Sequence, residues 1–411
     1  MKIITNNIPQ GYKDSPLGII PEEWEVRKLG DISKITSGST PLRSNVSYYI
    51  NGNIPWVKTK DLNNSILIST EENITEIALK ETSLKILPIG TILVAMYGGF
   101  NQIGRTGLLK IKATINQALA ALLIDKEKAH NFFVLNWLNS KVKLWEKYAA
   151  SSRKDPNITS HDVAIFPILI PPLPEQGKIA EVLSTWDKAI EKQSRLIEKL
   201  ELRKKGLMQQ LLTGKKRLPG FSCEWKTMKL GELFDERNET NMPALPLLSI
   251  TANKGIILQT ESEKKNTSND DKSKYKRICP NDIGYNTMRM WQGRCALSKL
   301  EGIVSPAYTI IIPHNNINPY YMEMLFKQPF MVYRFWTHSQ GLVNDTLNCK
   351  FPSFSQVKVI IPDLKEQNAI IEILLSCDTE ITLANQRFES LRQQKKGLMQ
   401  VLLTGKNRVI R

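Results

Sequence analysis

One glycine-rich segment of the sequence has residues spaced for phosphate binding. Gly99 and Gly104 enclose a short loop that follows an apolar run, and Arg105 comes next. A nucleotide-binding loop has similar glycines, but a lysine contacts the β- and γ-phosphates where this chain has Arg105. No apolar strand that ends in an acidic Mg²⁺ ligand stands out downstream. A loop with Asn101, Gln102 and Arg105 suits DNA better, because arginine binds phosphate and side-chain amides bind base edges.

The sequence shows no other pattern of catalytic residues. It has no Asn/Asp-Pro-Pro-Tyr/Phe motif for adenine methylation, since leucine follows its one double proline, Pro171-Pro172. The histidines are scattered without ligand spacing at positions 130, 161, 314 and 338. The 5 cysteines form no C-x-x-C pair, which disfavours a zinc site or a disulfide framework. We therefore expect a chain that is not catalytic by itself and binds no metal.

The balance of charge favours a polyanionic partner. The chain has 411 residues, and 56 Lys and Arg against 40 Asp and Glu give a formal net charge of +16. Such an excess is typical of proteins that bind nucleic acid. We expect no signal peptide and no membrane span, and a reducing, cytoplasmic setting. A merely basic soluble protein and weak membrane attachment through this charge remain alternatives.

Arg, Lys, amide and aromatic residues on expected loops are the candidate DNA contacts, because these side chains usually read bases and bind phosphates. In the first half of the chain they are Arg43, Lys58, Lys60, Tyr97, Asn101, Gln102, Arg105, Arg153 and Lys154. In the second half they are Asn253, Lys254, Arg289, Trp291, Gln292, Arg294, Ser339 and Gln340. For any single residue, a solvated surface position remains the alternative.

The elements that must position these residues occur twice. Residues 173–217 match residues 364–408 at a fixed offset without gaps, and KKGLMQQLLTGK differs from KKGLMQVLLTGK at one position. Fainter matches precede them, such as Trp24-x4-Leu29-Gly30 with Trp225-x4-Leu230-Gly231. The order is therefore variable segment, helix, variable segment, helix. Two readers of different targets on one frame would look like this, and an old duplication with one half drifting remains the alternative.

Each repeated segment predicts a long helix with a coiled-coil seam. Apolar residues recur at alternating steps of four and three, which is the spacing of such a seam. The first stripe is Ile179, Leu183, Trp186, Ile190, Gln193, Ile197, Leu200, Lys204, Leu207 and Leu211. The second is Ile370, Leu374, Cys377, Ile381, Ala384, Phe388, Leu391, Lys395, Leu398 and Leu402. The Thr-Gly pairs at 213–214 and 404–405 predict where the helices end.

Antiparallel pairing of these helices would make the chain a pseudo-two-fold structure that ends near where it begins. Roughly 34 helical residues at ~1.5 Å each give about 50 Å, which corresponds to roughly 15 base pairs of DNA at ~3.4 Å per pair. The polar seam residues Lys204 and Lys395 either set the register or pack their stems while their ammonium groups reach water. Candidate contacts with partner subunits are Val182, Ala189, Leu196, Leu212, Thr213, Leu403 and Thr404. The first three form a second apolar stripe that could equally widen the seam between the two helices.

These patterns predict four segments. A first variable domain covers residues 1–172, and a central spacer helix covers 173–217. A second variable domain covers 218–363, and a C-terminal spacer helix covers 364–411. The second domain has Ser249-Ile250-Thr251 where the first has Lys58-Thr59-Lys60, so we expect it to read a different target.

The layout resembles the specificity subunit of type I restriction-modification enzymes over nearly the whole chain. The most specific parts are Leu173 to Lys215 and Leu364 to Lys406. Further matches lie at Thr36 to Pro41, at Ile54-Pro55-Trp56 and at Asn116-Gln117-Ala118. The resemblance implies a mixed α/β (α+β) fold, in which the two variable domains are target recognition domains. Each would read one half of a split site on double-stranded DNA.

The resemblance also implies partner subunits that perform the chemistry. The two helices would act as a spacer and a docking surface for two modification subunits, which would carry S-adenosylmethionine and methylate adenine. A restriction subunit, a motor-nuclease with ATP and Mg²⁺, would cut, so no cofactor is expected on this chain. Two other classes remain open: a stand-alone DNA-binding regulator with a coiled-coil interface, and an unrecognised nuclease or methylase.

Overall fold

The computed structural model describes residues 8–99, 101–149, 157–251, 254–262, 268–341 and 346–409. The chain divides into two compact units. Unit 1 comprises Met1–Ser194 and Gln386–Arg411, and unit 2 comprises Arg195–Asn385. Because unit 1 is assembled from both ends of the sequence, the chain returns to the unit in which it began.

Unit 1 is built on a five-stranded sheet in the order β4-β11-β8-β9-β6. Its strands are β4 (Ser33–Ser37), β11 (Leu119–Ile124), β8 (Ile92–Ala95), β9 (Thr106–Leu109) and β6 (Ser65–Leu67). A three-stranded sheet contains β10 (Thr114–Ile115), β5 (Ile54–Val57) and β7 (Glu72–Ile74). Two strand pairs complete the unit: β1 (Tyr12–Lys13) with β2 (Ile20–Pro21), and β3 (Glu25–Lys28) with β12 (Pro167–Ile170).

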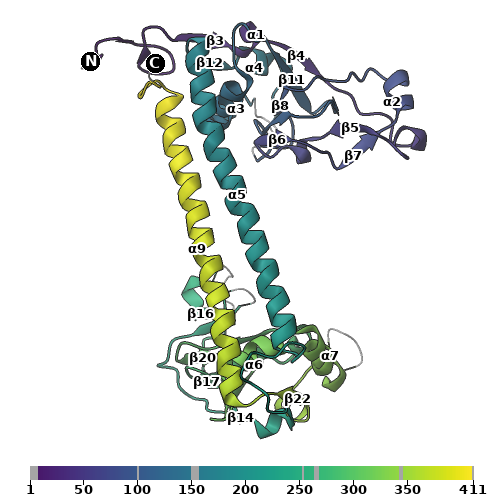
Figure 1. Cartoon of the computed structure of the whole chain (residues 1–411), viewed down its shortest axis with the longest axis vertical. Coiled ribbons are helices and arrows are strands. Elements are labelled where there is room, and N and C mark those ends of the chain that lie inside the picture. Colours follow the sequence, from purple (N-terminus) through teal and green to yellow (C-terminus); the bar gives the residue numbers. More distant parts are fainter. Residues whose placement is uncertain are drawn as a thin grey trace. The chain divides into compact units, whose positions relative to one another are not determined.

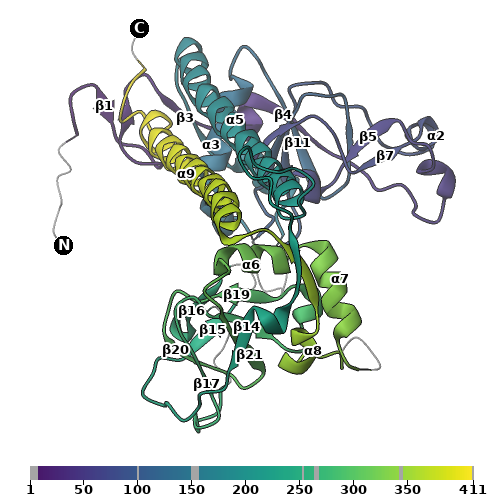
Figure 2. The same cartoon turned by 60° about the horizontal axis from the view of Figure 1, so that its bottom comes forward.

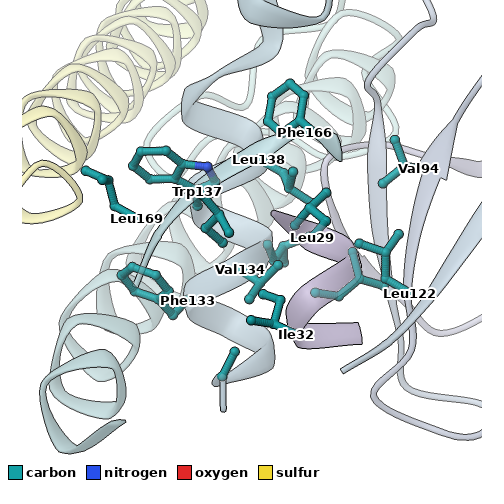
Figure 3. Close-up of a cluster of buried hydrophobic side chains, with 14 of the residues drawn as sticks. Leu29, Ile32, Val94, Leu122, Phe133, Val134, Trp137, Leu138, Phe166 and Leu169 are labelled. Carbon is teal, nitrogen blue, oxygen red and sulfur yellow. The ribbon is translucent and has the colours of Figure 1, made fainter. Parts of the chain in front are cut away.

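Short helices cover the sheets of unit 1. They are α1 (Leu29–Ile32), α2 (Glu76–Glu81), α3 (Asn131–Ser140) and α4 (Ser160–Ile165), with 3-10 turns η1 (Val46–Tyr48), η2 (Thr59–Asp61) and η3 (Val142–Lys147). Helix α3 lies between the large sheet and the long helix α5, whereas β5, β7 and α2 lie on the far side of that sheet (Figure 1). Residues 133–138 of α3 are all buried, because the helix is covered on both sides. Its Phe133, Val134 and Trp137 point into the main core (Figure 3).

Unit 2 repeats this plan with a four-stranded sheet in the order β14-β21-β18-β19. Its strands are β14 (Phe234–Arg237), β21 (Tyr308–Pro313), β18 (Ile283–Asn286) and β19 (Cys295–Leu297). Three strand pairs are β13 (Lys226–Lys229) with β22 (Lys358–Ile361), β15 (Leu248–Ile250) with β16 (Ile256–Leu258), and β17 (Lys276–Ile278) with β20 (Gly302–Val304).

The helices of unit 2 gather on one side, away from β15, β16, β17 and β20 (Figure 2). They are α6 (Pro319–Phe326), α7 (Pro329–His338) and α8 (Phe351–Ser355), with 3-10 turns η4 (Leu230–Glu232), η5 (Gln259–Glu261) and η6 (Met290–Gln292). The sheet orders β4-β11-β8-β9 and β14-β21-β18-β19 correspond strand by strand. The internal repeat read from the sequence is therefore confirmed in the topology, as is the mixed α/β fold.

Each of two long helices is divided between the units. Helix α5 (Leu173–Leu211) and helix α9 (Leu364–Leu402) have 39 residues each and begin at the predicted residues. Each is followed by a glycine in the left-handed region, Gly214 with φ +68° and Gly405 with φ +72°, as expected from the Thr-Gly pairs. Every residue of the two predicted stripes is buried or half-buried.

The long helices pair antiparallel within each unit. In unit 1 the beginning of α5 meets the end of α9, where Lys395 Nζ lies 2.6 Å from Asp187. In unit 2 the beginning of α9 meets the end of α5, where Lys204 bonds to Asp378. The two pairs are equivalent under the internal repeat. Both seam lysines thus bond to a carboxylate on the opposite helix.

The structure corrects two predicted partner contacts. Leu212 and Leu403 are fully buried, and each belongs to the main hydrophobic core of its own unit. A side chain inside a packed core has no surface to offer a partner. The end of each long helix is therefore part of a domain core, and the sequence could not show this because the apolar residues continue the helix stripe.

We expect Leu212→Ala to lower the free energy of unfolding of unit 2 by about 2–5 kcal/mol, since it removes buried methyl groups and leaves a cavity. The matched control is Leu202→Ala on the same helix, where the side chain is 67% exposed. That change should stay within about 0.5 kcal/mol. Urea denaturation of the purified chain measures both, and equal effects would contradict the burial of Leu212.

Candidate nucleic-acid interface

Strands β5 and β10 bring polar residues together in unit 1. They pair in parallel, with Trp56 opposite Thr114 and Val57 opposite Ile115, so their carboxyl ends meet at one edge. Lys58 follows β5, and Asn116 and Gln117 follow β10. The backbone N–H of Asn116 donates to the Val57 carbonyl at 3.0 Å, which fixes the two strand ends side by side.

Arg43 and Glu72 complete this group. Arg43 donates from Nη2 to Glu72 at 2.8 Å and from Nη1 at 3.3 Å. Its guanidinium carbon lies 4.6 Å from the Tyr49 ring centre and 5.0 Å from that of Trp56. Lys58 Nζ lies 3.1 Å from Glu72. We define the strand-end cluster as Arg43, Lys58, Glu72, Asn116 and Gln117.

The electrostatics of the strand-end cluster are dominated by one shared carboxylate. Hydrogen bonds from Arg43 hold the pKa of Glu72 below its usual 4.5, and Lys58 adds to this effect. The same hydrogen bonds raise the pKa of Arg43. Glu72 thus sits between two cations that would otherwise repel each other, and both were predicted from sequence to contact DNA.

The strand-end cluster also unites the three short motifs of the first domain. Thr40, from Thr36–Pro41, donates its hydroxyl to the side chain of Gln117. Trp56 Nε1 donates to the Ser39 carbonyl at 3.3 Å. Asn116 Oδ1 is buried and finds no hydrogen-bond partner among the residues described. Glu72, Asn116 and Gln117 were missed as site residues, although the motif Asn116-Gln117-Ala118 was a signal that could have identified two of them.

The glycine-rich segment of unit 1 forms the turn between β8 and β9. Strand β9 follows it directly, so the segment lacks the helix that a nucleotide-binding loop requires. Tyr97 and Asn101 are exposed, and Gln102 and Arg105 are half-buried. Lys60 is exposed within η2, outside this turn. The turn therefore places four of the predicted DNA contacts on one hairpin.

The equivalent hairpin of unit 2 joins β18 and β19. Arg289, Gln292 and Arg294 are exposed there, and half-buried Trp291 donates its Nε1 to the Met288 carbonyl at 2.9 Å. The structure thus brings four more predicted residues together on the corresponding turn. Gly293 has φ +70°, which lets the backbone reverse beside α7.

The remaining predicted DNA contacts are less clustered. Lys254 is exposed beyond β15. Ser339 donates its hydroxyl to the Phe335 carbonyl at 2.7 Å, and exposed Gln340 pairs through its backbone with Asn348. Arg153, Lys154 and Asn253 lie outside the described residues.

Each long helix begins at a buried carboxylate that ties the other helix to its unit. In unit 1 Glu175 accepts hydrogen bonds from Arg408 Nε at 2.7 Å and from Trp24 Nε1 at 3.1 Å. In unit 2 Glu366 accepts equivalent bonds from Arg217 Nε at 2.7 Å and from Trp225 Nε1 at 3.1 Å. We call these two arrangements the junctions. They hold the end of one helix against the start of the other.

A buried glutamine beside each junction positions a neighbouring short helix. Gln176 accepts from the His130 backbone N–H at 2.9 Å, just before α3. Gln367 accepts from the Asn318 backbone N–H at 2.8 Å, just before α6. The Glu-Gln pair in both repeats therefore has a structural role in joining helix to domain.

The predicted partner contacts that are not in a core differ in exposure. Val182 and Ala189 are half-buried, whereas Leu196 is 45% exposed. Thr213 and Thr404 donate their hydroxyls to the carbonyls of Gln209 and Gln400, which ends each helix. Among residues 8–409 outside the undescribed gaps, no His, Cys, Asp and Glu group is arranged to hold a metal ion, and no helix is long and apolar enough to cross a membrane.

Two domains of one topology, each with a polar hairpin and each tied to a pair of long helices, define a duplicated DNA-recognition protein. The family model described as "Type I restriction modification DNA specificity domain" matches residues 21–202 and 223–393. The chain therefore belongs to the type I restriction-modification specificity-subunit family, with two such domains.

Known relatives agree with this assignment. The MjaVIII specificity subunit of Methanocaldococcus jannaschii is 27% identical over 95% of this chain and 94% of its own length. The MjaIX specificity subunit of the same organism is 34% identical, over 46% of this chain and 45% of its own length. The crystal structure of an S subunit from M. genitalium covers 98% of both chains with a TM-score of 0.56 at 16% identity, which shows a shared fold.

The pKa of Glu72 predicts an acid-dependent part of the stability of unit 1. Because folding lowers this pKa, its contribution is present above the unfolded value of 4.5 and is lost as pH falls through the lower folded value. When the pH falls from 5 to about 3, we expect the free energy of unfolding to decrease less in the Glu72→Gln variant than in the native chain. Denaturant titrations at the two pH values measure this. Identical losses in both proteins would contradict the ion pair with Arg43.

Proposed function

We propose that this specificity subunit reads a bipartite site on double-stranded DNA, with one half-site for each domain. The observation that carries the proposal is the pair of equivalent hairpins, β8–β9 and β18–β19. Both present basic, amide and aromatic side chains, and these side chains differ between the two. Equivalent positions with different side chains suit the recognition of two different half-sites.

The chain itself is proposed to be non-catalytic and to assemble with two modification subunits and with restriction subunits. In this proposal S-adenosylmethionine, ATP and Mg²⁺ are bound by those partners, in the cytoplasm. A solved structure that matches 94% of this chain with a TM-score of 0.60 is described as concerning "complex assembly" of "the type I R-M system". The exposed Leu196, with Val182 and Ala189, is the proposed surface for a partner helix.

Methylation mapping in the host genome tests this function. We expect a bipartite motif with an unread gap and one methylated adenine on each strand. The sequence-based spacing of about 50 Å, or roughly 15 base pairs, stays a prediction of the distance between the two half-site readers. A continuous palindrome, or no methylation that depends on this chain, would contradict the proposal.

Exchange of the first domain provides a second test. Replacement of residues 1–172 by the corresponding segment of another family member should change one half of the methylated motif and leave the other half intact. The physical reason is that each domain has its own core and its own hairpin. Altered bases in both halves would show that the domains do not read independently.

Loss of a hairpin arginine should weaken DNA binding and make the affinity depend less steeply on salt concentration. We expect Arg294→Ala to reduce the slope of log affinity against log salt concentration by about 0.9 if Arg294 meets a phosphate. The control is Lys299→Ala, because exposed Lys299 lies just beyond the opposite end of β19. Binding of the assembled complex to its mapped site, measured at several salt concentrations, distinguishes the two variants.

A stand-alone regulator with a coiled-coil interface is the second candidate. Such regulators usually obtain two-fold symmetry from two identical chains, whereas this chain contains two similar domains. Measurement of the mass of the purified chain, alone and with its modification subunit, separates the candidates. A stable self-dimer that ignores the modification subunit would favour the regulator.

A further inference from the structure

Arg43 is restrained by a carboxylate and by two aromatic rings. Glu72 accepts from two of its nitrogens, and the rings of Tyr49 and Trp56 lie under its guanidinium carbon. Yet its side chain remains 53% exposed. A cation that is held in one orientation and still faces solvent is suited to directional hydrogen bonding with a ligand.

The N–H donors of Arg43 that Glu72 leaves available match the acceptors on the edge of a base pair. A guanidinium has five N–H donors in a planar fork, and the two bonds to Glu72 engage Nη1 and Nη2. The edge formed by Nε and Nη2 retains two parallel donors. Two parallel donors are what an arginine uses to bind O6 and N7 of guanine in the major groove.

The orientation of Glu72 is itself determined by the sheet. Glu72 on β7 lies opposite Trp56 on β5 in the strand register. The carboxylate and one of the rings under Arg43 therefore come from paired residues on adjacent strands. Because the sheet sets the distance between them, Arg43 is positioned by a rigid element although it lies in a loop.

We propose that Glu72 is a positioning residue for DNA recognition, which holds Arg43 so that its remaining donor edge reads one base pair of the first half-site. This inference rests on the proposed function of unit 1 as a half-site reader. Glu72 does not touch DNA in this arrangement. It acts through Arg43, and it also offsets the repulsion between Arg43 and Lys58.

The substitution Glu72→Gln isolates this role. Lys58 keeps a second carboxylate, since Glu71 lies 3.4 Å from its Nζ, so the change acts mainly on Arg43. Arg43→Lys is the second variant, because lysine keeps the charge and loses the planar fork. The matched control is Glu76→Gln, which removes the same charge from an exposed position on α2.

The experiment expresses each full-length variant with its modification subunits in cells and maps methylated adenines across the genome. We expect Glu72→Gln and Arg43→Lys to lower discrimination at the same single base pair by about tenfold to hundredfold. The rest of the first half-site and all of the second should stay unchanged. Glu76→Gln should give the native motif.

The outcomes separate this inference from the function on which it rests. A native chain that directs no bipartite methylation overturns the proposed function. A bipartite native motif that Glu72→Gln leaves intact, or relaxes at a position different from Arg43→Lys, overturns the positioning role. If the Glu72→Gln variant does not fold, the double variant with Arg43→Ala and Glu72→Gln replaces it, because removal of both residues leaves no unpaired charge. If the double variant still discriminates fully at that base pair, the inference is likewise overturned.

Discussion

The architecture of both units depends on a carboxylate buried at the start of a long helix. Glu175 and Glu366 are almost inaccessible, and each is satisfied by one tryptophan and one arginine. A buried charge is costly unless it is paired and hydrogen-bonded, so removal of either donor penalises the whole junction. Because Arg408 comes from the last residues of the chain, the junction also joins the end of the sequence to the unit where it began.

The ends of the long helices explain why the internal repeat is strongest there. Leu402 and Leu403 enter the core of unit 1, and Leu211 and Leu212 enter that of unit 2. The residues at the ends of the helices must therefore pack both in the seam between the helices and in a domain core, and they must lead into a glycine turn. The hairpins carry no such combination of constraints, so their side chains are free to differ.

Several of the basic residues that give the chain its positive charge form ion pairs with acidic neighbours. Arg43 and Lys58 share Glu72, and on the helices Lys204 and Lys395 bond to Asp378 and Asp187. In contrast, Arg289 and Arg294 are exposed on the hairpin of unit 2. The placement of carboxylates thus distinguishes cations that an acidic side chain holds in one orientation, such as Arg43, from cations that lie exposed on a hairpin, such as Arg294.

The sequence by itself determined the duplication, the two long helices with their ends, and the residue types of the two hairpins. These features are local or periodic, and a helix stripe or a Thr-Gly stop needs no knowledge of distant residues. The tertiary structure alone decided that Leu212 and Leu403 are core residues and that Glu72 binds Arg43. It also decided that Thr40 meets Gln117, because the neighbouring Ser39 N–H donates to the carbonyl of Ile115, which ends β10. Such contacts depend on strand register and on chain closure, which no local pattern of residues encodes.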